Sequence, residues 1–266
     1  MKTCSELFVS RQSVKKKAGF KHSTYPTIPK RSKIAALDFT TAELSGRGHM
    51  DTESAYKEYF SLLLAGDKAN CARLTQKLID EKIDLETLYM SFFKRSLYEI
   101  GDLWEKNKIS VATEHLCTSI TEYLMTLAHP VIFGIARTGK KAVVSCVANE
   151  YHQVGGKMVA DVLELSGWDA YFLGADTPVK DLIAMINEKK PHLLCLSLSV
   201  YFNIHHLTEA VRKVRERWTE LPVWIGGKAF EYGARTIFDS YEKVRIVNSL
   251  TELKSLLLAF EDHRGE

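Results

Sequence analysis

The sequence lacks several features that would define a function class at once. No apolar run reaches the roughly 20 residues that a membrane-spanning helix needs. The five cysteines are scattered, odd in number and without metal-binding spacing, which predicts free thiols in a reducing compartment. The chain shows no internal repeat, phosphate loop or nucleophile–base pair. We therefore expect a cytoplasmic protein that is not an enzyme.

Basic residues are concentrated at the start of the chain. Residues 1–50 carry ten lysines and arginines against three acidic residues, whereas the remainder is acidic on balance. This segment has no sustained apolar period, and we interpret it as a disordered basic tail. Contact with nucleic acid, an acidic partner or a membrane surface stays open, although a solvated tail is the simpler interpretation. No helix-turn-helix pattern is present, so direct DNA binding is not expected.

Residues 51–137 have the pattern of a helical bundle. Apolar residues recur at spacings of three and four in four segments with short breaks between them. The third segment ends near Trp104, and Ser110 is a typical N-cap for the fourth. Four amphipathic helices with short connections predict an antiparallel four-helix bundle.

The period changes after Gly139, and residues 138–266 predict a second domain. Strand patterns lie at 141–147, 168–173, 192–198, 221–226 and 244–248. Helical patterns lie at about 155–166, 178–189, 203–218, 228–237 and 250–261, with Thr177-Pro178 as the cap and first residue of the second helix. Alternating strands and helices predict an α/β fold: a Rossmann-like (flavodoxin-like) parallel five-stranded sheet covered on both faces.

Polar and small residues follow the predicted strands of this sheet. Glu150 and His152 come just after the first strand, where open α/β folds bind ligands, and the carboxylate can orient the imidazole. Gly155 lets a large group approach the backbone. Further small residues end later strands: Gly174, Ser197, Ser199, Gly226 and Gly227. Each is unremarkable alone, since a loop histidine or a strand-ending glycine is common, but together they predict one binding edge.

The spacing of these residues resembles the cobalamin-binding module of methionine synthases and related corrinoid proteins. The family fingerprint is Asp-x-His-x-x-Gly, then Ser-x-Leu, then Gly-Gly. Here 41 residues separate Gly155 from Ser197, and 26 separate Ser199 from Gly226. Glu150 replaces the usual Asp, and Ser199 stands where Leu is usual. The resemblance implies that His152 is the lower axial ligand of cobalt and that Glu150 orients it.

The resemblance also implies a slot for the cofactor's displaced nucleotide tail. Four small residues would line it: Ser197, Ser199, Gly226 and Gly227. Gly174 would help to shape the same edge.

A second motif links two helices of the predicted bundle. Trp104 is followed after nine residues by Glu114 and His115, near the start of the fourth helix. Considered alone, Trp104 would be a core tryptophan and His115 a surface histidine. As a set they offer a flat apolar face beside groups that can hydrogen-bond a polar ligand.

This Trp-x9-Glu-His motif resembles the cobalamin photoreceptors of the CarH type and their AerR-type relatives without a DNA-binding domain. The resemblance implies that the bundle caps the upper face of the corrin. Trp104 would pack over the upper ligand, commonly 5′-deoxyadenosyl, and Glu114 and His115 would hold it. Glu105 stands where CarH has a histidine, so the resemblance does not extend to a bis-histidine photoproduct by that route.

The function predicted from these motifs is a cobalamin-dependent sensor, adenosylcobalamin being favoured over methylcobalamin. Light or a reacting partner would break the cobalt–carbon bond, change the packing of bundle on sheet, and signal to a partner such as a transcription repressor. A corrinoid methyl carrier of a methyltransferase system is the alternative, and a protein that has kept only the fold is a third hypothesis. The sequence leaves the upper ligand, the input, the partner and homo-oligomer formation open.

Overall fold

The structure is a computed structural model that describes residues 52–233 and 235–260. The predicted basic tail, residues 1–50, lies outside the described residues. Within them, no helix is long and apolar enough to cross a membrane. The four described cysteines, Cys71, Cys117, Cys146 and Cys195, are free and buried, which confirms the free thiols predicted for this part of the chain.

The first part of the described chain is helical, as predicted. Its elements are α1 (Thr52–Leu64), α2 (Lys68–Asp80), α3 (Leu85–Thr87), η3 (Leu88–Lys94), α4 (Arg95–Glu105), α5 (Val111–Met125), η4 (Thr126–Ala128) and α6 (His129–Phe133). Three of the helices begin at a side chain that accepts a backbone N–H three residues on, namely Asp67, Asp84 and Ser110. The N-cap predicted at Ser110 is therefore confirmed.

The third predicted helix has a wider turn in its middle. α3, η3 and α4 follow one another without a break, and η3 is a seven-residue π-helix. Its residues Tyr89, Phe92 and Phe93 are fully buried. A π-helical segment inside an α-helix is rare and is often found at functional sites. Periodicity did not predict it, because apolar residues at spacings of three and four fit either helix.

The second part is a parallel sheet with helices on both faces. Its strands are β1 (Lys141–Cys146), β2 (Asp169–Phe172), β3 (Leu193–Ser197), β4 (Val223–Gly226) and β5 (Val244–Ile246). The helices between and after them are α7 (Val154–Leu165), α8 (Val179–Lys189), η5 (Tyr201–Asn203), α9 (Ile204–Arg215), η6 (Lys228–Tyr232), η7 (Arg235–Ile237) and α10 (Leu250–Leu258). The strand order β2-β1-β3-β4-β5 is that of the flavodoxin-like fold, which confirms the predicted fold class.

Two local predictions were wrong. Residues 228–232 and 235–237 form two short 3₁₀ segments instead of the single helix predicted at 228–237, because Gly233 adopts a φ of 125°, which an α-helix does not allow. Pro178 is the N-cap of α8, not its first residue, because its ψ of 142° is extended. Thr177 instead forms a parallel bridge with Val147, which continues the sheet for one more residue.

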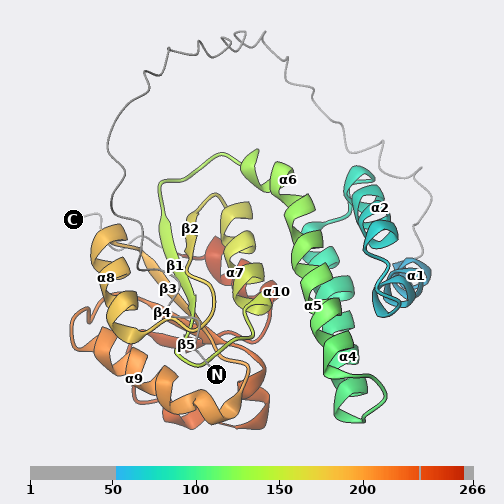
Figure 1. The fold of residues 1–266 in the computed structure, drawn as a ribbon. Coiled ribbons are helices and arrows are strands. Elements are labelled where there is room, and N and C mark those ends of the chain that lie inside the picture. Colours follow the sequence, from blue (N-terminus) through green and yellow to red (C-terminus); the bar gives the residue numbers. More distant parts are fainter. Residues whose placement is uncertain (1–51, 234, 261–266) are drawn as a thin grey trace, which may run out of the picture. The chain divides into compact units, whose positions relative to one another are not determined.

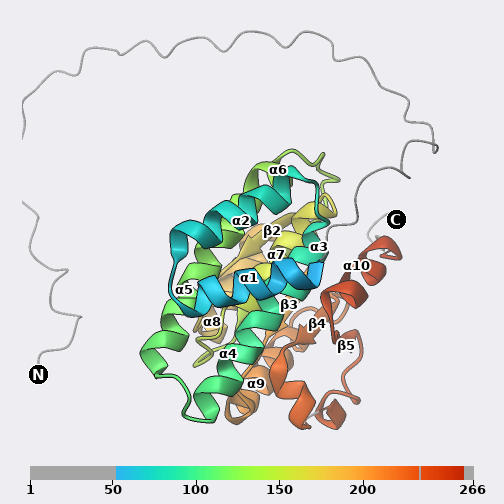
Figure 2. The ribbon, with the colours of Figure 1, turned by 90° about the vertical axis from the view of Figure 1, so that its right-hand side faces the viewer.

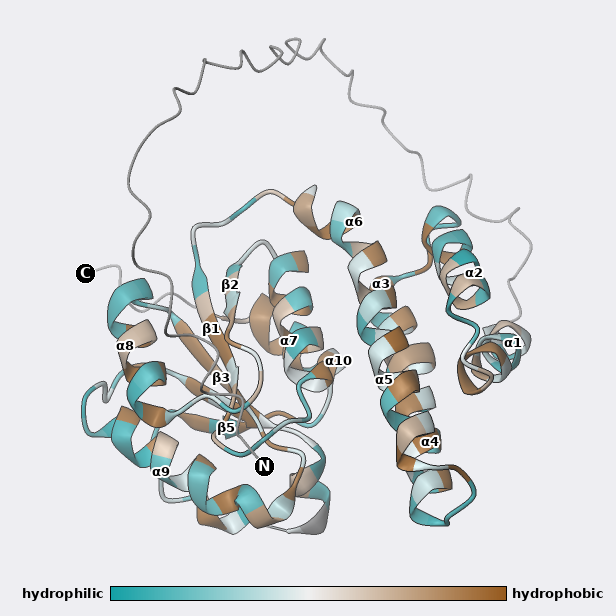
Figure 3. Cartoon of the chain, viewed as in Figure 1, coloured by the Kyte–Doolittle hydropathy of each residue, from teal (hydrophilic) through white to brown (hydrophobic). Residues whose placement is uncertain are grey.

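Side chains that alternate along the strands divide the core in two. Val143, Leu194 and Leu196 pack with α8 and α9, whereas Val144, Leu193 and Cys195 belong to the core shared with α7, α10 and the helical part. Figure 1 shows α8 and α9 on one face of the sheet and α7 on the side of α4 and α5. Figure 2 shows α1 and α4 in front of the sheet, and Figure 3 shows brown, hydrophobic residues along the strands.

Candidate functional site

The carboxyl ends of three neighbouring strands form the floor of the site. Cys146 at the end of β1 pairs with Ser197 at the end of β3, which in turn pairs with Gly226 at the end of β4. The loops that follow these ends therefore start side by side. β1 and β3 also form the topological switch point of the sheet, where connections leave to opposite faces and ligands bind in such folds.

Glu150 is the buried centre of this edge. Its side chain has no exposed surface. One carboxylate oxygen accepts hydrogen bonds from the backbone N–H of His152 at 2.8 Å and from its ring Nδ1 at 2.6 Å. The other accepts from the backbone N–H groups of Ser199 and Val200, at 2.8 and 2.9 Å. One carboxylate thus joins the loop after β1 to the loop after β3.

These hydrogen bonds set the charges of the pair. Burial opposes ionisation of Glu150, but the hydrogen bonds from His152, Val200 and Ser199 outweigh it and hold the pKa of the carboxyl below its ordinary value. The hydrogen bond to Glu150 raises the pKa of His152 against the effect of burial; Glu114 adds to this shift and Lys228 opposes it. An ionised carboxylate can only accept, so His152 donates through Nδ1.

The other ring nitrogen of His152 is free to bind a ligand. With the proton on Nδ1, Nε2 carries the lone pair of the neutral ring. No described residue hydrogen-bonds Nε2, and the side chain is 64% exposed. Among the described residues, no group of three or more His, Cys, Asp or Glu side chains is arranged to hold a metal ion.

A cavity of about 1210 Å³ lies above this edge, between the sheet and the helical part. Nine of the eleven residues predicted as binding residues line it: Trp104, Glu114, His115, His152, Gly155, Ser197, Ser199, Gly226 and Gly227. Glu150 lies beneath the lining. The volume exceeds the 300–1,000 Å³ or so of typical small-molecule pockets, which suits a large ligand.

The upper wall is formed by α4 and α5. Trp104 is 45% exposed, so it is not the core residue that its own helix pattern favours. Glu114 accepts a hydrogen bond from Thr118 at 3.1 Å, and His115 lies 3.4 Å from the Glu114 carboxylate. The structure thus brings the Trp and Glu-His residues to one wall, opposite His152.

The glycines of the floor have different roles. A Cβ on Gly226 would lie 2.8 Å from the Val247 carbonyl oxygen, and one on Gly227 would lie 2.1 Å from that of Leu198. Both are therefore required by the packing of the protein itself. A Cβ on Gly155 would meet only Ser197 Oγ, at 4.0 Å, so the small residue there leaves free space in the cavity.

Gly174 is not among the residues that line the cavity. It lies past the end of β2 with φ of 82°, and a Cβ there would lie 3.5 Å from Gln153 Oε1. Its carbonyl oxygen accepts the backbone N–H of Cys146 at 3.1 Å. Gly174 therefore contacts the end of β1 and lies next to the loop that carries His152, and it does not line the cavity.

Several cavity residues were missed from the sequence. Glu122 accepts a hydrogen bond from Gln153 at 2.8 Å, which links α5 directly to the residue after His152. Its position seven residues after His115 places it on the same helix face and could have indicated it. Lys94 and Lys228 also line the cavity, and each places its Nζ near the ring of Tyr98, at 5.2 and 5.1 Å from the ring centroid. Lys228 directly follows Gly226-Gly227, but no local pattern connects it with Lys94.

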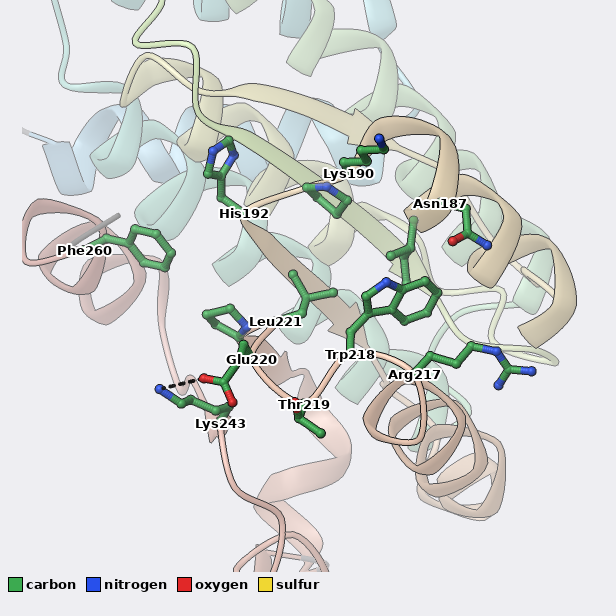
Figure 4. A pocket seen from close by; sticks show the side chains of 13 residues that line it. Asn187, Lys190, His192, Arg217, Trp218, Thr219, Glu220, Leu221, Lys243 and Phe260 are labelled. Atoms are coloured by element: carbon green, nitrogen blue, oxygen red, sulfur yellow. Dashed lines mark ion pairs between the residues drawn. The ribbon is translucent and has the colours of Figure 1, made fainter. Parts of the chain in front are cut away.

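A second, smaller cavity of about 590 Å³ lies at the opposite edge of the sheet (Figure 4). It is lined by residues that precede strands, such as His192 and Leu221, together with Trp218 and Phe260. Its Lys243 lies 3.8 Å from Glu220. None of the predicted site residues reaches it.

Comparison with known proteins finds two parts of the chain that are similar to B12-binding domains. Residues 140–247 match one family described as a B12 binding domain, and residues 55–128 match a second family with the same description. The matches cover both walls of the large cavity.

Individual relatives are distant. The chain is 26% identical over 194 residues to the HTH-type transcriptional repressor CarH of Myxococcus xanthus, an alignment covering 71% of this chain and 64% of that protein. It is 19% identical over 171 residues to the corrinoid protein DSY3155 of Desulfitobacterium hafniense, covering 62% of this chain and 78% of that one. The monomethylamine corrinoid protein of Methanosarcina barkeri has the same fold, with a TM-score of 0.68, 13% identity and coverage of 78% of this chain and 99% of that chain.

Proposed function

We propose that this chain is a cobalamin-dependent sensor in which residues 51–137 cap the cofactor and residues 138–266 hold it from below. One observation carries the proposal: the free Nε2 of an oriented histidine faces a large cavity whose opposite wall holds Trp104, Glu114 and His115. His152 would be the lower ligand of cobalt, with Glu150 fixing the ring and its tautomer.

The upper wall favours an adenosyl group over a methyl group. An exposed tryptophan face suits a flat ring, and the Glu114 carboxylate and His115 imidazole suit hydroxyl and amine groups. A methyl group would use none of these. When bound, an alkylcobalamin supplies a cobalt–carbon bond that light or a reacting partner can break.

The position of the cavity between the helical part and the sheet would let a change of the upper ligand alter how the two pack. Loss of an upper ligand would remove a group from between α4–α5 and the sheet edge. The link between Glu122 and Gln153 would then transmit movement of α5 to the loop of His152. We infer that the changed packing is recognised by a partner protein such as a transcription repressor, on which this chain would act as an antirepressor.

The experiment is to load the purified protein with adenosylcobalamin in the dark and record its absorption spectrum before and after green light. We expect a retained spectrum that changes on illumination. Trp104→Ala should alter the response and His152→Ala should weaken retention. Trp218→Ala, at the second cavity, is the matched control and should behave as wild type. If neither wild type nor His152→Ala retains a corrinoid, the proposal fails.

A corrinoid methyl carrier is the second candidate, favoured by the shared fold with the monomethylamine corrinoid protein and the similarity to DSY3155. It would use the same lower ligand and leave the Trp104 wall without a role. Binding of methylcobalamin with methyl transfer to a thiol acceptor, and without selective retention of the adenosyl form or response to light, would favour the carrier over the sensor.

A further inference from the structure

Two lysines from the two walls of the large cavity meet at one aromatic ring. Lys94 of η3 places its Nζ 5.2 Å from the centroid of Tyr98, and Lys228 of η6 places its own 5.1 Å from the same centroid. Lys94 and Tyr98 belong to the helical part, whereas Lys228 follows β4. All three line the cavity and are half-buried.

This arrangement places two like charges at one ring. Each ammonium group lies about 5 Å from one centroid, so the two are no more than about 10 Å apart. Within residues 52–233 and 235–260, no ion pair within 4.0 Å joins either lysine to a carboxylate. Contact with the face of a tyrosine replaces only part of the hydration that a half-buried ammonium group loses.

The position of the pair selects one part of a cobalamin molecule. The amide side chains of the corrin ring are neutral, and the phosphodiester of the nucleotide loop carries a negative charge. Lys228 is the residue after Gly226-Gly227, which belong to the slot that the family resemblance implies for the nucleotide tail. An ammonium group from each wall, near the same ring, can donate a charge-assisted hydrogen bond to a phosphate oxygen.

We propose that Lys94 and Lys228 form an anion subsite that binds the phosphodiester of the cofactor's nucleotide loop. The proposal rests on the cobalamin-binding function above and names two residues that the motif comparison does not include. Because one lysine comes from each wall, the phosphate would also bridge the helical part and the sheet domain. A corrinoid without a nucleotide loop would fill the cavity and leave this bridge unmade.

The test compares three corrinoids with the same upper ligand, measured in the dark by equilibrium binding. Adenosylcobalamin has the complete nucleotide loop, adenosylcobinamide phosphate has the phosphate without the base, and adenosylcobinamide has neither. We expect Lys228→Gln and Lys94→Gln each to raise the Kd of the two phosphate-containing ligands about tenfold. The Kd of adenosylcobinamide should change less than about twofold, and Lys228→Arg should retain most of the affinity for adenosylcobalamin.

Lys180→Gln is the matched control, because Lys180 is an exposed residue of α8 that lines neither cavity. Circular dichroism melting of every variant checks that the fold is kept. Equal weakening of all three corrinoids would show that the lysines only support the wall, and unchanged binding of all three would show that they do not touch the ligand. Either result overturns the subsite and leaves cobalamin binding standing. If wild type binds no corrinoid, both proposals fall.

Discussion

Replacing Glu150 by glutamine would move the ring proton of His152, the proposed cobalt ligand, from Nδ1 to Nε2. The carboxylate accepts from four N–H groups, two on each oxygen. A glutamine has one oxygen and must turn its NH₂ group toward one of the two pairs. If the NH₂ faces Ser199 and Val200, two buried N–H groups lose their acceptor, which costs about 2–6 kcal/mol.

The other orientation costs less. If the NH₂ faces His152, only the backbone N–H of that residue is stranded, at about 1–3 kcal/mol, because the ring can change tautomer and accept at Nδ1. The ring proton then moves to Nε2. We therefore expect Glu150→Gln to lower the free energy of unfolding by about 1–3 kcal/mol and to block coordination at Nε2.

Two measurements check this. Urea unfolding gives the stability change, for which Glu188→Gln, at an exposed pair with Lys189, is the control and should change stability by less than about 1 kcal/mol. ¹⁵N NMR of the imidazole at alkaline pH, where the ring is neutral, gives the tautomer without any ligand. A variant that keeps the proton on Nδ1, or that is as stable as wild type, would refute the reasoning.

Three further results are expected. Gly227→Ala should lower the free energy of unfolding by on the order of 3 kcal/mol in urea titrations, because φ is 123° and the new Cβ meets the Leu198 carbonyl oxygen. Gly155→Ala should leave stability unchanged or raise it by up to about 1 kcal/mol, since the residue lies in a helix, while the new methyl weakens cobalamin binding measured by titration. Burial raises the pKa of Asp161 to about 6 although Tyr89 donates to it at 2.7 Å. The folded chain therefore holds this proton more tightly than the unfolded chain, so stability should fall by up to about 3 kcal/mol as pH rises from about 4 to 6. Asp161→Asn should remove that part of the slope in urea unfolding at a series of pH values, and an unchanged slope would contradict the assignment.

The fold was predictable because each half of the chain has one dominant period. Apolar spacing of three and four gave the helices before Gly139, and short apolar runs bounded by loops gave the strands after it. The helix prediction after Gly227 was wrong because the buried residues there, Ala229 and Phe230, face the core from a 3₁₀ turn between two glycines with positive φ. Local pattern cannot distinguish that turn from the start of a helix.

The site was predictable only where its residues lie close in sequence or follow a strand. Glu150 and His152 are two residues apart, so their contact could be expected from an extended loop. Lys94 and Tyr98, four apart on a helix, have the pattern of a solvated face. Their proximity to Lys228 depends on how the helical part packs against the sheet, and this packing cannot be predicted from residue spacing in the sequence.

The carboxylate that joins the loops after β1 and β3 has a consequence for when the site can form. Residues 150 and 200 are 50 positions apart, so the bond from Val200 exists only after β3 has been synthesised and has paired with β1. During synthesis, a nascent chain that ends before β3 can carry His152 but cannot hold Glu150 in place to orient it. Competence to capture a corrinoid should therefore arise late in translation, after the third strand has left the ribosome.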